Sequence, residues 1–295
     1  SLPIHLELFE AMGWQKPKYA HLPVIMKLEF DRRRKLSKRK DPEAAVSFFL
    51  ESGYPIEGIL EYLMTLANTD FEEWRLAHLT DNIFDFSLRF EKMTLDGALF
   101  DIEKIQSISK ERLGAMNADE IASKAHAWAK RFDETFAQHI ELDFEYFKSI
   151  LAIERGGEKP RKDYVRYQDI YPIINFMYDD VFDEALTKPL PYNPIYSKDI
   201  IIHVLETFLS QPALALPEGE WFDNLKQLAS LCGFAMNVKD WKKNKEAYLG
   251  HIGDFAEIIR ISVSGRVNTP NFYYVLRILG IDRIQDRLLK SIKTL

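Results

Sequence analysis

The segment from position 32 to position 40 concentrates the side chains that could bind anions. Seven of its nine residues are Lys or Arg and none is acidic, so it is too polar to form part of a core. Asp41, Pro42 and Glu43 follow, which are typical of a helix start: a capping residue, a proline at the first helical position and an acid in the first turn. A cationic loop that leads into a helix start is suited to hold phosphate groups. On composition alone, a solvated charge run or a localisation-type basic patch is the commoner explanation.

Length, composition and net charge limit the kind of protein to which this basic segment belongs. A length of 295 residues suggests about two domains, and 46% apolar residues suffice for buried cores. The sequence has no apolar run of about 18 residues and no secretory leader pattern, so we expect no membrane association. The only cysteine, Cys232, lies in an apolar helical run and is expected to be a buried small hydrophobe in a reducing compartment. The net charge of −6 argues mildly against a nucleic-acid partner, although a basic loop acts locally, within a Debye length of about 8 Å.

Hydrophobic periodicity predicts an almost wholly helical chain from Asp41 onward, with no strand of any length after Met26. Helices are expected over 42–50 and 56–67, and capping boxes at Asp70–Glu73 and Asn117–Glu120. The prolines at 189–194 mark a boundary between two helical halves. Further apolar faces are predicted at Ile121, Ala125, Trp128, Phe132 and Phe136, at Ile201, Val204, Leu205 and Phe208, and at Trp221, Leu225, Leu228 and Ala229. Pro270 should start a helix that Gly280 ends, and Asp282 can cap the last helix.

The string Lys35-Leu36-Ser37-Lys38-Arg39 resembles the KMSKS loop of class I aminoacyl-tRNA synthetases, in the KLSKR form typical of glutamyl-tRNA synthetases. Other segments resemble the same family in the same order, and together they span nearly the whole chain. They are Leu8–Trp14 with Pro17–Pro23, the two helices joined by Gly53-Tyr54-Pro55, Phe100–Ile105, and Ser264-Gly265-Arg266 with Pro270 and Leu279-Gly280.

The resemblance implies a mainly α fold in four parts. Residues 1–40 would be the end of the Rossmann-like catalytic domain with its lysine loop, and 41–98 a helical stem-contact region. Residues 99–190 and 195–295 would be two helical anticodon-binding halves. The implied activity is ATP-dependent activation of glutamate and its transfer to tRNA(Glu). ATP, with Mg²⁺ in the full-length enzyme, would be used by a cytoplasmic monomer.

The resemblance also assigns roles to residues of the loop. Lys38 corresponds to the motif's second lysine and would contact phosphate, Lys35 would support it, and Ser37 would donate a hydrogen bond or shape the turn. All three would bind ATP, and no metal ligands are expected. His21 would shape the approach to the loop. The additional arginines at 32–34 depart from the family pattern and would either strengthen ATP or tRNA contacts or be solvated.

Nucleic-acid contacts are expected outside the lysine loop as well. Arg161, Arg166 and Arg266 stand in expected loops and are candidate tRNA contacts, because splayed bases are held on aromatic rings and arginine planes. The segment 155–162 is expected to be a mobile loop.

Two alternatives stay open from the sequence. The chain could be a non-catalytic helical module that binds tRNA or protein, or it could derive from a glutaminyl-tRNA synthetase, although that family's β-barrels disagree with the helical pattern. His251-Ile252-Gly253-Asp254 resembles three letters of the family's ATP-binding HIGH motif. It follows the lysine loop instead of preceding it, so packing explains it better, and this chain alone is expected to be inactive.

Overall fold

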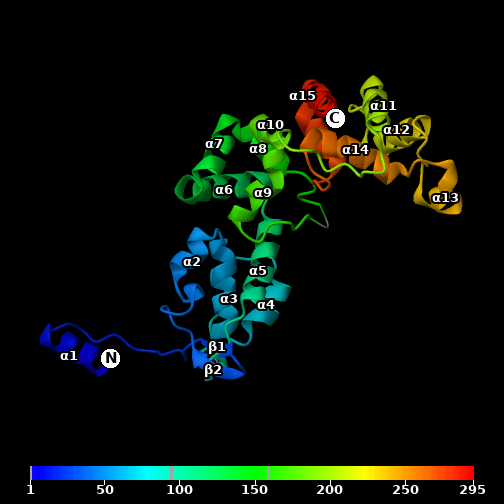
Figure 1. Cartoon of the computed structure of the whole chain (residues 1–295). Coiled ribbons are helices and arrows are strands. Elements are labelled where there is room, and N and C mark those ends of the chain that lie inside the picture. The colour runs from blue at the N-terminus through cyan, green and yellow to red at the C-terminus, as the bar shows by residue number, and fades with distance from the viewer. Residues whose placement is uncertain (1, 94–95, 158–159) are drawn as a thin grey trace. The chain divides into compact units, whose positions relative to one another are not determined.

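The structure is a computed structural model, and it describes residues 2–93, 96–157 and 160–295 (Figure 1). Helices α1 to α15 and six short 3-10 helices hold most of these residues, and their only sheet has two strands. The predicted mainly α fold is therefore confirmed. The chain forms two compact units, residues 1–50 with 56–109 and residues 51–55 with 110–295. In the described ranges, no helix is both long and apolar enough to span a membrane.

The first unit contains a β-hairpin and several short helices. Its elements are α1 (Leu2–Ala11), β1 (Met26–Glu29), β2 (Arg32–Lys35), η1 (Pro42–Ala44), α2 (Val46–Glu51), α3 (Ile56–Ala67), α4 (Phe71–Ala77), η2 (Ile83–Asp85), η3 (Phe90–Lys92) and the first part of α5 (Ile102–Ala115). No residue of α1 is buried. Helix α3 has the predicted bounds, and buried Tyr62 ties it to the start of α5 by accepting a hydrogen bond from the Asp101 N–H at 2.7 Å.

The expectation of no strand after Met26 is wrong. Strands β1 and β2 pair antiparallel, with Met26 opposite Lys35 and Glu29 opposite Arg32. Residues 98–100 run beside β1. The Met26 N–H donates to Ala98 O, and the Met26 carbonyl accepts the Phe100 N–H. The hairpin escaped prediction because β2 reads Arg-Arg-Arg-Lys and lacks apolar alternation. Ion pairs across the hairpin, described below, stabilise it in place of an apolar face.

Two predicted helix starts in this unit differ in detail. Pro42 does begin a helical turn, but it is a 3-10 helix, and the Asp41 side chain does not cap it. The predicted capping box at Asp70 is also wrong, because its carboxylate pairs with Arg89 and Lys92 instead of the backbone of α4. In both cases a cation competes successfully with the backbone N–H groups for the carboxylate.

The second unit is a helical assembly around one continuous core. It contains the rest of α5, then α6 (Ala118–Phe132), α7 (Glu134–Leu142), α8 (Phe144–Leu151), η4 (Tyr167–Asp169), α9 (Ile170–Ile174), η5 (Asn175–Met177), α10 (Asp179–Ala185), α11 (Lys198–Ser210), α12 (Glu218–Leu231), α13 (Val238–Lys243), η6 (Lys245–Ala247), α14 (Ile252–Ser264) and α15 (Phe272–Thr294). The predicted apolar faces of α11 and α12 are buried, as is Cys232.

Breaks between these helices follow the caps and glycines of the sequence. Asn117 caps α6 as predicted, but the predicted capping box is incomplete, because the Glu120 carboxylate pairs with Lys124. The face predicted to run from Ile121 to Phe136 is divided, because Asp133 caps a new helix, α7, and leaves Phe132 38% exposed. Gly280 interrupts α15 with a left-handed backbone (φ 76°, ψ 162°), as its predicted helix-ending role requires. The proline segment 189–194 carries no helix and separates α10 from α11.

Candidate phosphate-binding loop

The basic loop forms a tight turn directly after strand β2 of the hairpin. Leu36 N–H donates to Ile25 O at 2.9 Å, which fixes the point where the chain leaves β2. The Ser37 carbonyl then accepts the N–H groups of Lys40 and Asp41, at 3.0 and 2.8 Å. Lys38, Arg39 and Lys40 therefore occupy a closed turn. The Ser37 backbone thus closes the turn, while the roles predicted for Ser37 in ATP binding stay predictions.

One buried carboxylate organises this turn. Asp41, 1% exposed, accepts Ser37 N–H at 2.9 Å and a two-pronged contact from the Arg34 guanidinium at 2.6 and 2.7 Å. Lys27 Nζ, on the opposite strand, adds a third partner at 3.1 Å. Arg34 also reaches Glu29, and Lys27 also pairs with Glu43. The hydrogen bond from Arg34, followed by those from Ser37 N–H and Lys27, holds the pKa of the Asp41 carboxyl well below its usual range.

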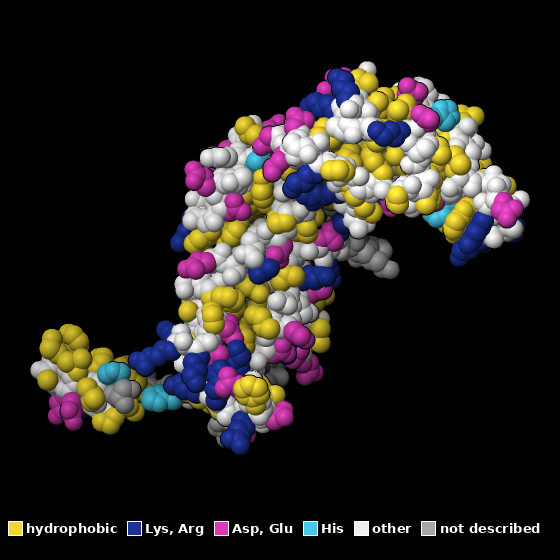
Figure 2. Space-filling model, viewed as in Figure 1, with side chains coloured by type: hydrophobic (Ala, Val, Ile, Leu, Met, Phe, Trp, Pro, Cys, Tyr) yellow, Lys and Arg dark blue, Asp and Glu magenta, His cyan; other side chains and the backbone are white. Residues whose placement is uncertain are grey.

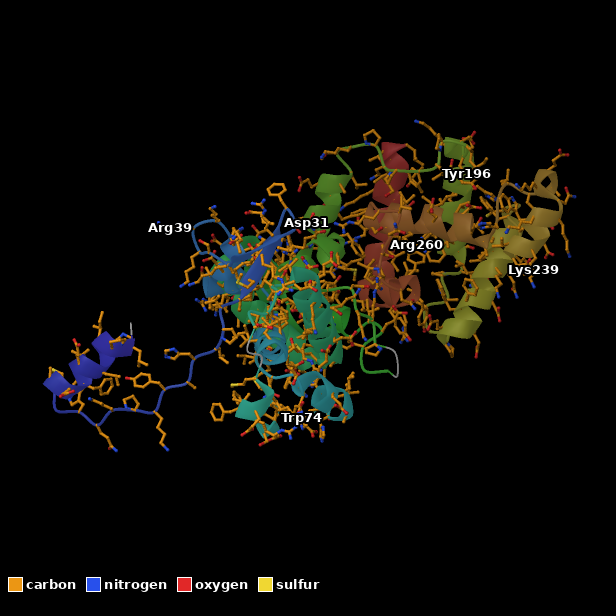
Figure 3. All side chains as sticks on the ribbon, turned by 90° about the horizontal axis from the view of Figure 1, so that it is seen from below. Asp31, Arg39, Trp74, Tyr196, Lys239 and Arg260 are labelled. Carbon is orange, nitrogen blue, oxygen red and sulfur yellow. The ribbon has the colours of Figure 1, made fainter. Side chains whose placement is uncertain are left out.

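The same pairing sorts the basic residues into two groups. Arg34 is half-buried, and its pKa is raised above the usual value by Asp41 and then Glu29. The other six side chains are exposed and make no ion pair within the described ranges: Arg32, Arg33, Lys35, Lys38, Arg39 and Lys40. Figure 2 shows dark blue side chains gathered over the hairpin, and Figure 3 shows Arg39 at the outer edge of the loop. The loop can therefore offer Lys35 and Lys38 to an anion while Asp41 and Arg34 maintain its shape.

Sequence reasoning missed Asp41 as the centre of the loop. The signal was present, since the nine residues before it contain seven cations and no acid. A carboxylate in that position is the local counter-charge, and burial then favours a bidentate arginine contact over a helix cap. Lys27 gave no such signal, because only the hairpin register places it opposite Arg34.

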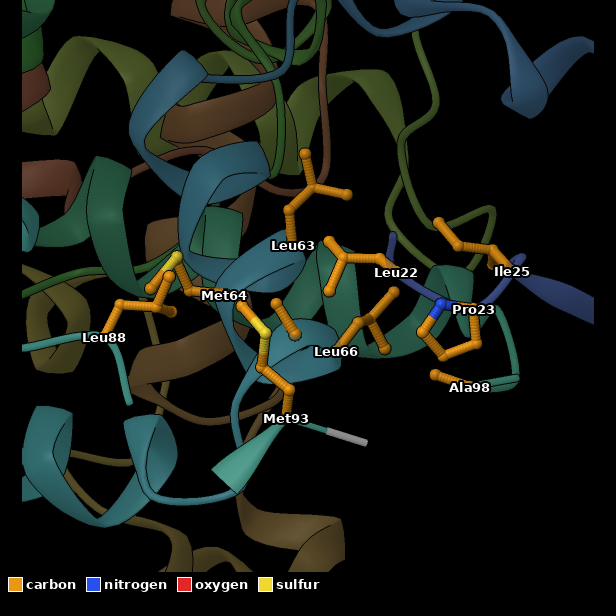
Figure 4. Close-up of a pocket in the computed structure, with 10 residues that line it drawn as sticks. Leu22, Pro23, Ile25, Leu63, Met64, Leu66, Leu88, Met93 and Ala98 are labelled. Atoms are coloured by element: carbon orange, nitrogen blue, oxygen red, sulfur yellow. The ribbon is translucent and has the colours of Figure 1, made fainter. Parts of the chain in front are cut away.

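An apolar pocket of about 350 Å³ lies behind the segment that enters the hairpin (Figure 4). Leu22, Pro23 and Ile25 form one wall, and α3 contributes another with Leu63, Met64, Leu66 and Ala67. Leu88, Met93 and Ala98 complete the lining. With no polar side chain in its wall, the pocket cannot orient a nucleotide or an amino acid. Leu22 and Pro23 of its wall belong to the segment that leads to the loop, and the neighbouring His21 is exposed.

The first two arginines proposed from sequence both lie in the second unit. Arg161 contacts Glu154 Oε2 at 3.4 Å and also pairs with Asp163. Arg166 donates to Asp169 Oδ1 at 2.7 Å and lies 5.8 Å from the centre of the Tyr54 ring. Both guanidinium groups are partly exposed but partnered. Two residues of the segment 155–162, Glu158 and Lys159, lie outside the described residues.

Arg266 is held more tightly by the protein. Its guanidinium donates to Pro172 O at 2.6 Å, to Ile173 O at 3.4 Å and to the Asn175 side chain, and it lies over the Phe176 ring. Burial lowers the pKa of Arg266 below the ordinary value. These contacts join the end of α14 to the α9–η5 segment.

A second pocket, of about 340 Å³, was not anticipated from the sequence. Trp221 and Phe222 of α12 and Phe272 and Tyr273 of α15 line it, together with Arg260 of α14. The Arg260 guanidinium lies 5.1 Å from the centre of the Phe272 ring and donates to Val267 O at 3.2 Å, and burial lowers its pKa. Aromatic walls beside an arginine suit a flat ring such as a nucleobase.

The segment that resembles the HIGH motif has a structural role. His251 Nδ1 accepts the N–H groups of Gly253 and Asp254, and the Asp254 carboxylate accepts His251 N–H at 2.7 Å. The two side chains thus form a capping box at the start of α14. Across the ranges described, no cluster of three or more His, Cys, Asp or Glu side chains is arranged to hold a metal ion.

Known proteins resemble this chain along nearly all of its length. A glutamate–tRNA ligase of Clostridium perfringens (strain 13 / Type A) is 34% identical over 288 residues, covering 98% of this chain and 53% of the relative. One of Clostridium beijerinckii is 35% identical over 288 residues, covering 97% and 52%. The chain thus spans about half the length of the curated relatives it matches. No protein-family model matches the sequence.

Solved structures share the fold. A glutamate tRNA ligase from Elizabethkingia meningosepticum, in complex with its amino acid, superposes with a TM-score of 0.66 over the whole chain and 55% of its own length, at 19% identity. A glutamate-tRNA synthetase from Elizabethkingia anophelis gives a TM-score of 0.63 over 98% of this chain and 54% of its own length, at 19% identity. By sequence along nearly its full length, the chain is similar to glutamate–tRNA ligases, about half of whose length it spans.

Proposed function

We propose that this chain is the carboxyl-terminal part of a glutamate–tRNA ligase, which activates glutamate with ATP and transfers it to tRNA(Glu). The observation that carries the proposal is the match to such ligases over 98% of the chain, and the geometry of the basic loop supports it. In the proposed division, residues 1–40 complete the catalytic domain and 41–98 contact the tRNA stem. Residues 99–190 and 195–295 bind the anticodon region. The full-length enzyme would work as a monomer in the cytoplasm.

The proposed role of the loop is to stabilise phosphate charge during activation. When the glutamate carboxylate attacks the α-phosphorus of ATP, negative charge builds on the departing pyrophosphate. Lys38 would contact these phosphates and Lys35 would add a second positive charge, as fixed cations do in other phosphate-transfer sites. Ser37 holds the turn through its backbone, and Asp41 fixes Ser37 and Arg34. Mg²⁺ bound with ATP would supply further neutralisation of the phosphates.

The proposed role of the second unit is to bind tRNA. Its aromatic pocket beside Arg260 could accept an unpaired base, since stacking of a base on an aromatic ring is sequence-tolerant and favourable. Arg161, Arg166 and Arg266 would contact the tRNA around it. Each of the three also has an intramolecular partner, so a substitution must be examined for folding as well as for binding.

A titration of the 295-residue chain with two tRNAs tests the proposal. We expect a glutamate tRNA to bind more tightly than an unrelated tRNA by about 5- to 100-fold, the worth of one base-specific hydrogen-bonded contact of about 1–3 kcal/mol. Binding should weaken as salt rises, because neutralised phosphates release counterions. Fluorescence titration at two salt concentrations measures both effects. Equal affinity for the two tRNAs would exclude anticodon recognition by this chain, and absence of binding would overturn the tRNA part of the proposal.

A further inference from the structure

The tip of the β-hairpin has an unfavourable turn. Phe30 and Asp31 connect the two strands, and both have positive φ, 47° and 60°. A two-residue turn of this kind favours Asn-Gly or Asp-Gly, since residues with a bulky side chain rarely adopt left-handed backbone angles. Neither position is Gly or Asn here. Retention of such a conformation is a reason to look for a function at the tip.

The Phe30 side chain gains nothing from the fold that would offset this conformation. It is 95% exposed, and none of the ring contacts of the described residues involves it. Scattered surface hydrophobes are common, but an almost fully exposed aromatic ring in a left-handed turn is not. The ring is therefore available to a partner.

Cations accompany this ring on one face of the hairpin. In an antiparallel pair, residues opposite each other share a face, so Leu28, Arg33 and Lys35 lie together on the face opposite to the one that carries Lys27 and Arg34. Arg33 and Lys35 are exposed and make no ion pair within the described ranges, and Leu28 is 55% exposed. Beside the turn that carries Phe30, this face thus combines a small apolar surface with two cations.

We propose that an unpaired nucleotide of the bound tRNA stacks on Phe30, with its neighbouring phosphate on Arg33. Stacking on an exposed ring beside cations is how single-stranded nucleic acid is held without hydrogen-bond readout. A protein partner is a poorer fit, because a stable protein interface needs about 800 Å² on each side and one ring with one leucine supplies much less. The proposal rests on the proposed tRNA-binding function and adds a site to it.

Substitution at position 30 separates stacking from folding. Phe30→Asn places a residue that tolerates positive φ in the turn and removes the ring. We expect thermal stability to be equal or higher, while tRNA affinity falls by about 5- to 100-fold, the usual effect of losing one stacked base. Phe84→Asn is the matched control, because Phe84 is 83% exposed in the same unit but is flanked by acidic Asp81 and Asp85. It should leave affinity unchanged.

Phe30→Trp supplies an independent readout. A tryptophan that stacks on a base loses fluorescence, so the variant should show tRNA-dependent quenching beyond that of the chain's own five tryptophans. Two results would refute the stacking site and leave the proposed function standing, provided that the unaltered chain binds tRNA. The first is equal tRNA affinity of Phe30→Asn and the unaltered chain, and the second is the absence of added quenching in Phe30→Trp. Equal losses of affinity in Phe30→Asn and Phe84→Asn would also refute the stacking site. Failure of the unaltered chain to bind tRNA would instead count against the proposed function. If Phe30→Asn abolished self-association without changing tRNA affinity, a second copy would be the partner, and the proposal would be wrong.

Discussion

At the scale of single residues, Asp41 decides whether the basic loop has a fixed shape. Replacing it with Asn keeps the size of the side chain but removes the charge that Arg34 and Lys27 share. We expect Asp41→Asn to fold, with a looser loop in which the Ser37 amide exchanges its hydrogen faster than in the unaltered chain. Hydrogen exchange followed by NMR measures this. Equal protection of Ser37 in both proteins would show that the Ser37 carbonyl contacts alone hold the turn.

The lowered pKa of Asp41 gives the same loop a pH dependence. Because the folded-state pKa lies below the unfolded value, the stabilisation is complete above the unfolded pKa of about 4. It is lost progressively as the pH falls below 4 toward the folded-state pKa. Ser37 protection should therefore decline on acidification in the unaltered chain, and this local decline should be absent in Asp41→Asn. A decline of the same size in the variant would assign it to another carboxyl group.

Lys38 can be distinguished from its neighbours in the loop by kinetics. In the full-length ligase, we expect Lys38→Ala to slow adenylate formation by about 100- to 1,000-fold, the usual effect of removing one donor to a developing negative charge, with little change in glutamate binding. Lys40→Ala is the control, because Lys40 is also exposed and makes no ion pair within the described ranges. Pre-steady-state measurement of adenylate formation is the assay. A Lys38→Ala rate within about threefold of the unaltered enzyme would make this lysine an ordinary surface charge.

At the scale of elements, local patterns predicted the helices better than the contacts between them. The apolar faces of α11 and α12 are readable because their period matches a helix and their side chains are buried. The hairpin could not be predicted, because charged side chains stabilise it, and these meet only once the two strands have paired. Asp41 and Asp70 look like helix caps locally, yet Arg34 and Arg89 take their carboxylates. For the site, the motif predicted Lys35, Ser37 and Lys38, whereas Asp41 and the Arg260 pocket could not be predicted, because they depend on tertiary packing.

The break in α15 provides a stability test at this scale. Gly280 adopts φ 76° and ψ 162°, a region that is almost exclusive to glycine, and a Cβ there would meet no atom within 4 Å. Gly280→Ala should therefore destabilise the protein through backbone strain alone, by roughly 1–3 kcal/mol. Gly219→Ala, in the first turn of α12, likewise has open space but an ordinary backbone. It should be neutral or stabilising by up to about 1 kcal/mol. Urea denaturation of both variants measures the difference, and equal effects would contradict the strain argument.

At the scale of the whole second unit, Arg287 joins helices that are distant in the sequence. This arginine is 1% exposed and donates to the carbonyls of Phe176, Met177 and Val263 and to the Asp179 carboxylate. Arg287→Met should destabilise the chain by about 3–5 kcal/mol, because buried acceptors lose their donor.

Arg283 offers the matched comparison for Arg287. It also contacts Asp179, at 3.3 Å, but its side chain is 45% exposed. Arg283→Met should cost no more than about 1 kcal/mol. The free energies of unfolding of the two variants decide the matter. If Arg287→Met is no worse than Arg283→Met, the carbonyl contacts contribute little, and apolar packing alone connects α14 and α15 to residues 176–179.

The catalytic capacity of the chain is a property of the whole molecule. The chain spans about half the length of the ligases it matches. Its HIGH-like segment caps α14, and the pocket lined by Leu22, Pro23 and Ile25 has only apolar side chains in its wall. Among the residues that the structure describes, none of these features selects glutamate or adenine. We therefore expect the 295-residue chain, assayed alone, to show no glutamate-dependent exchange of pyrophosphate into ATP while it still binds tRNA.

The tRNA titration on the same preparation is the control, because tRNA binding would show that the protein is folded. Exchange that requires glutamate and is lost in Lys38→Ala would mean that this half carries a complete activation site. The division of labour proposed for the ligase would then have to be abandoned.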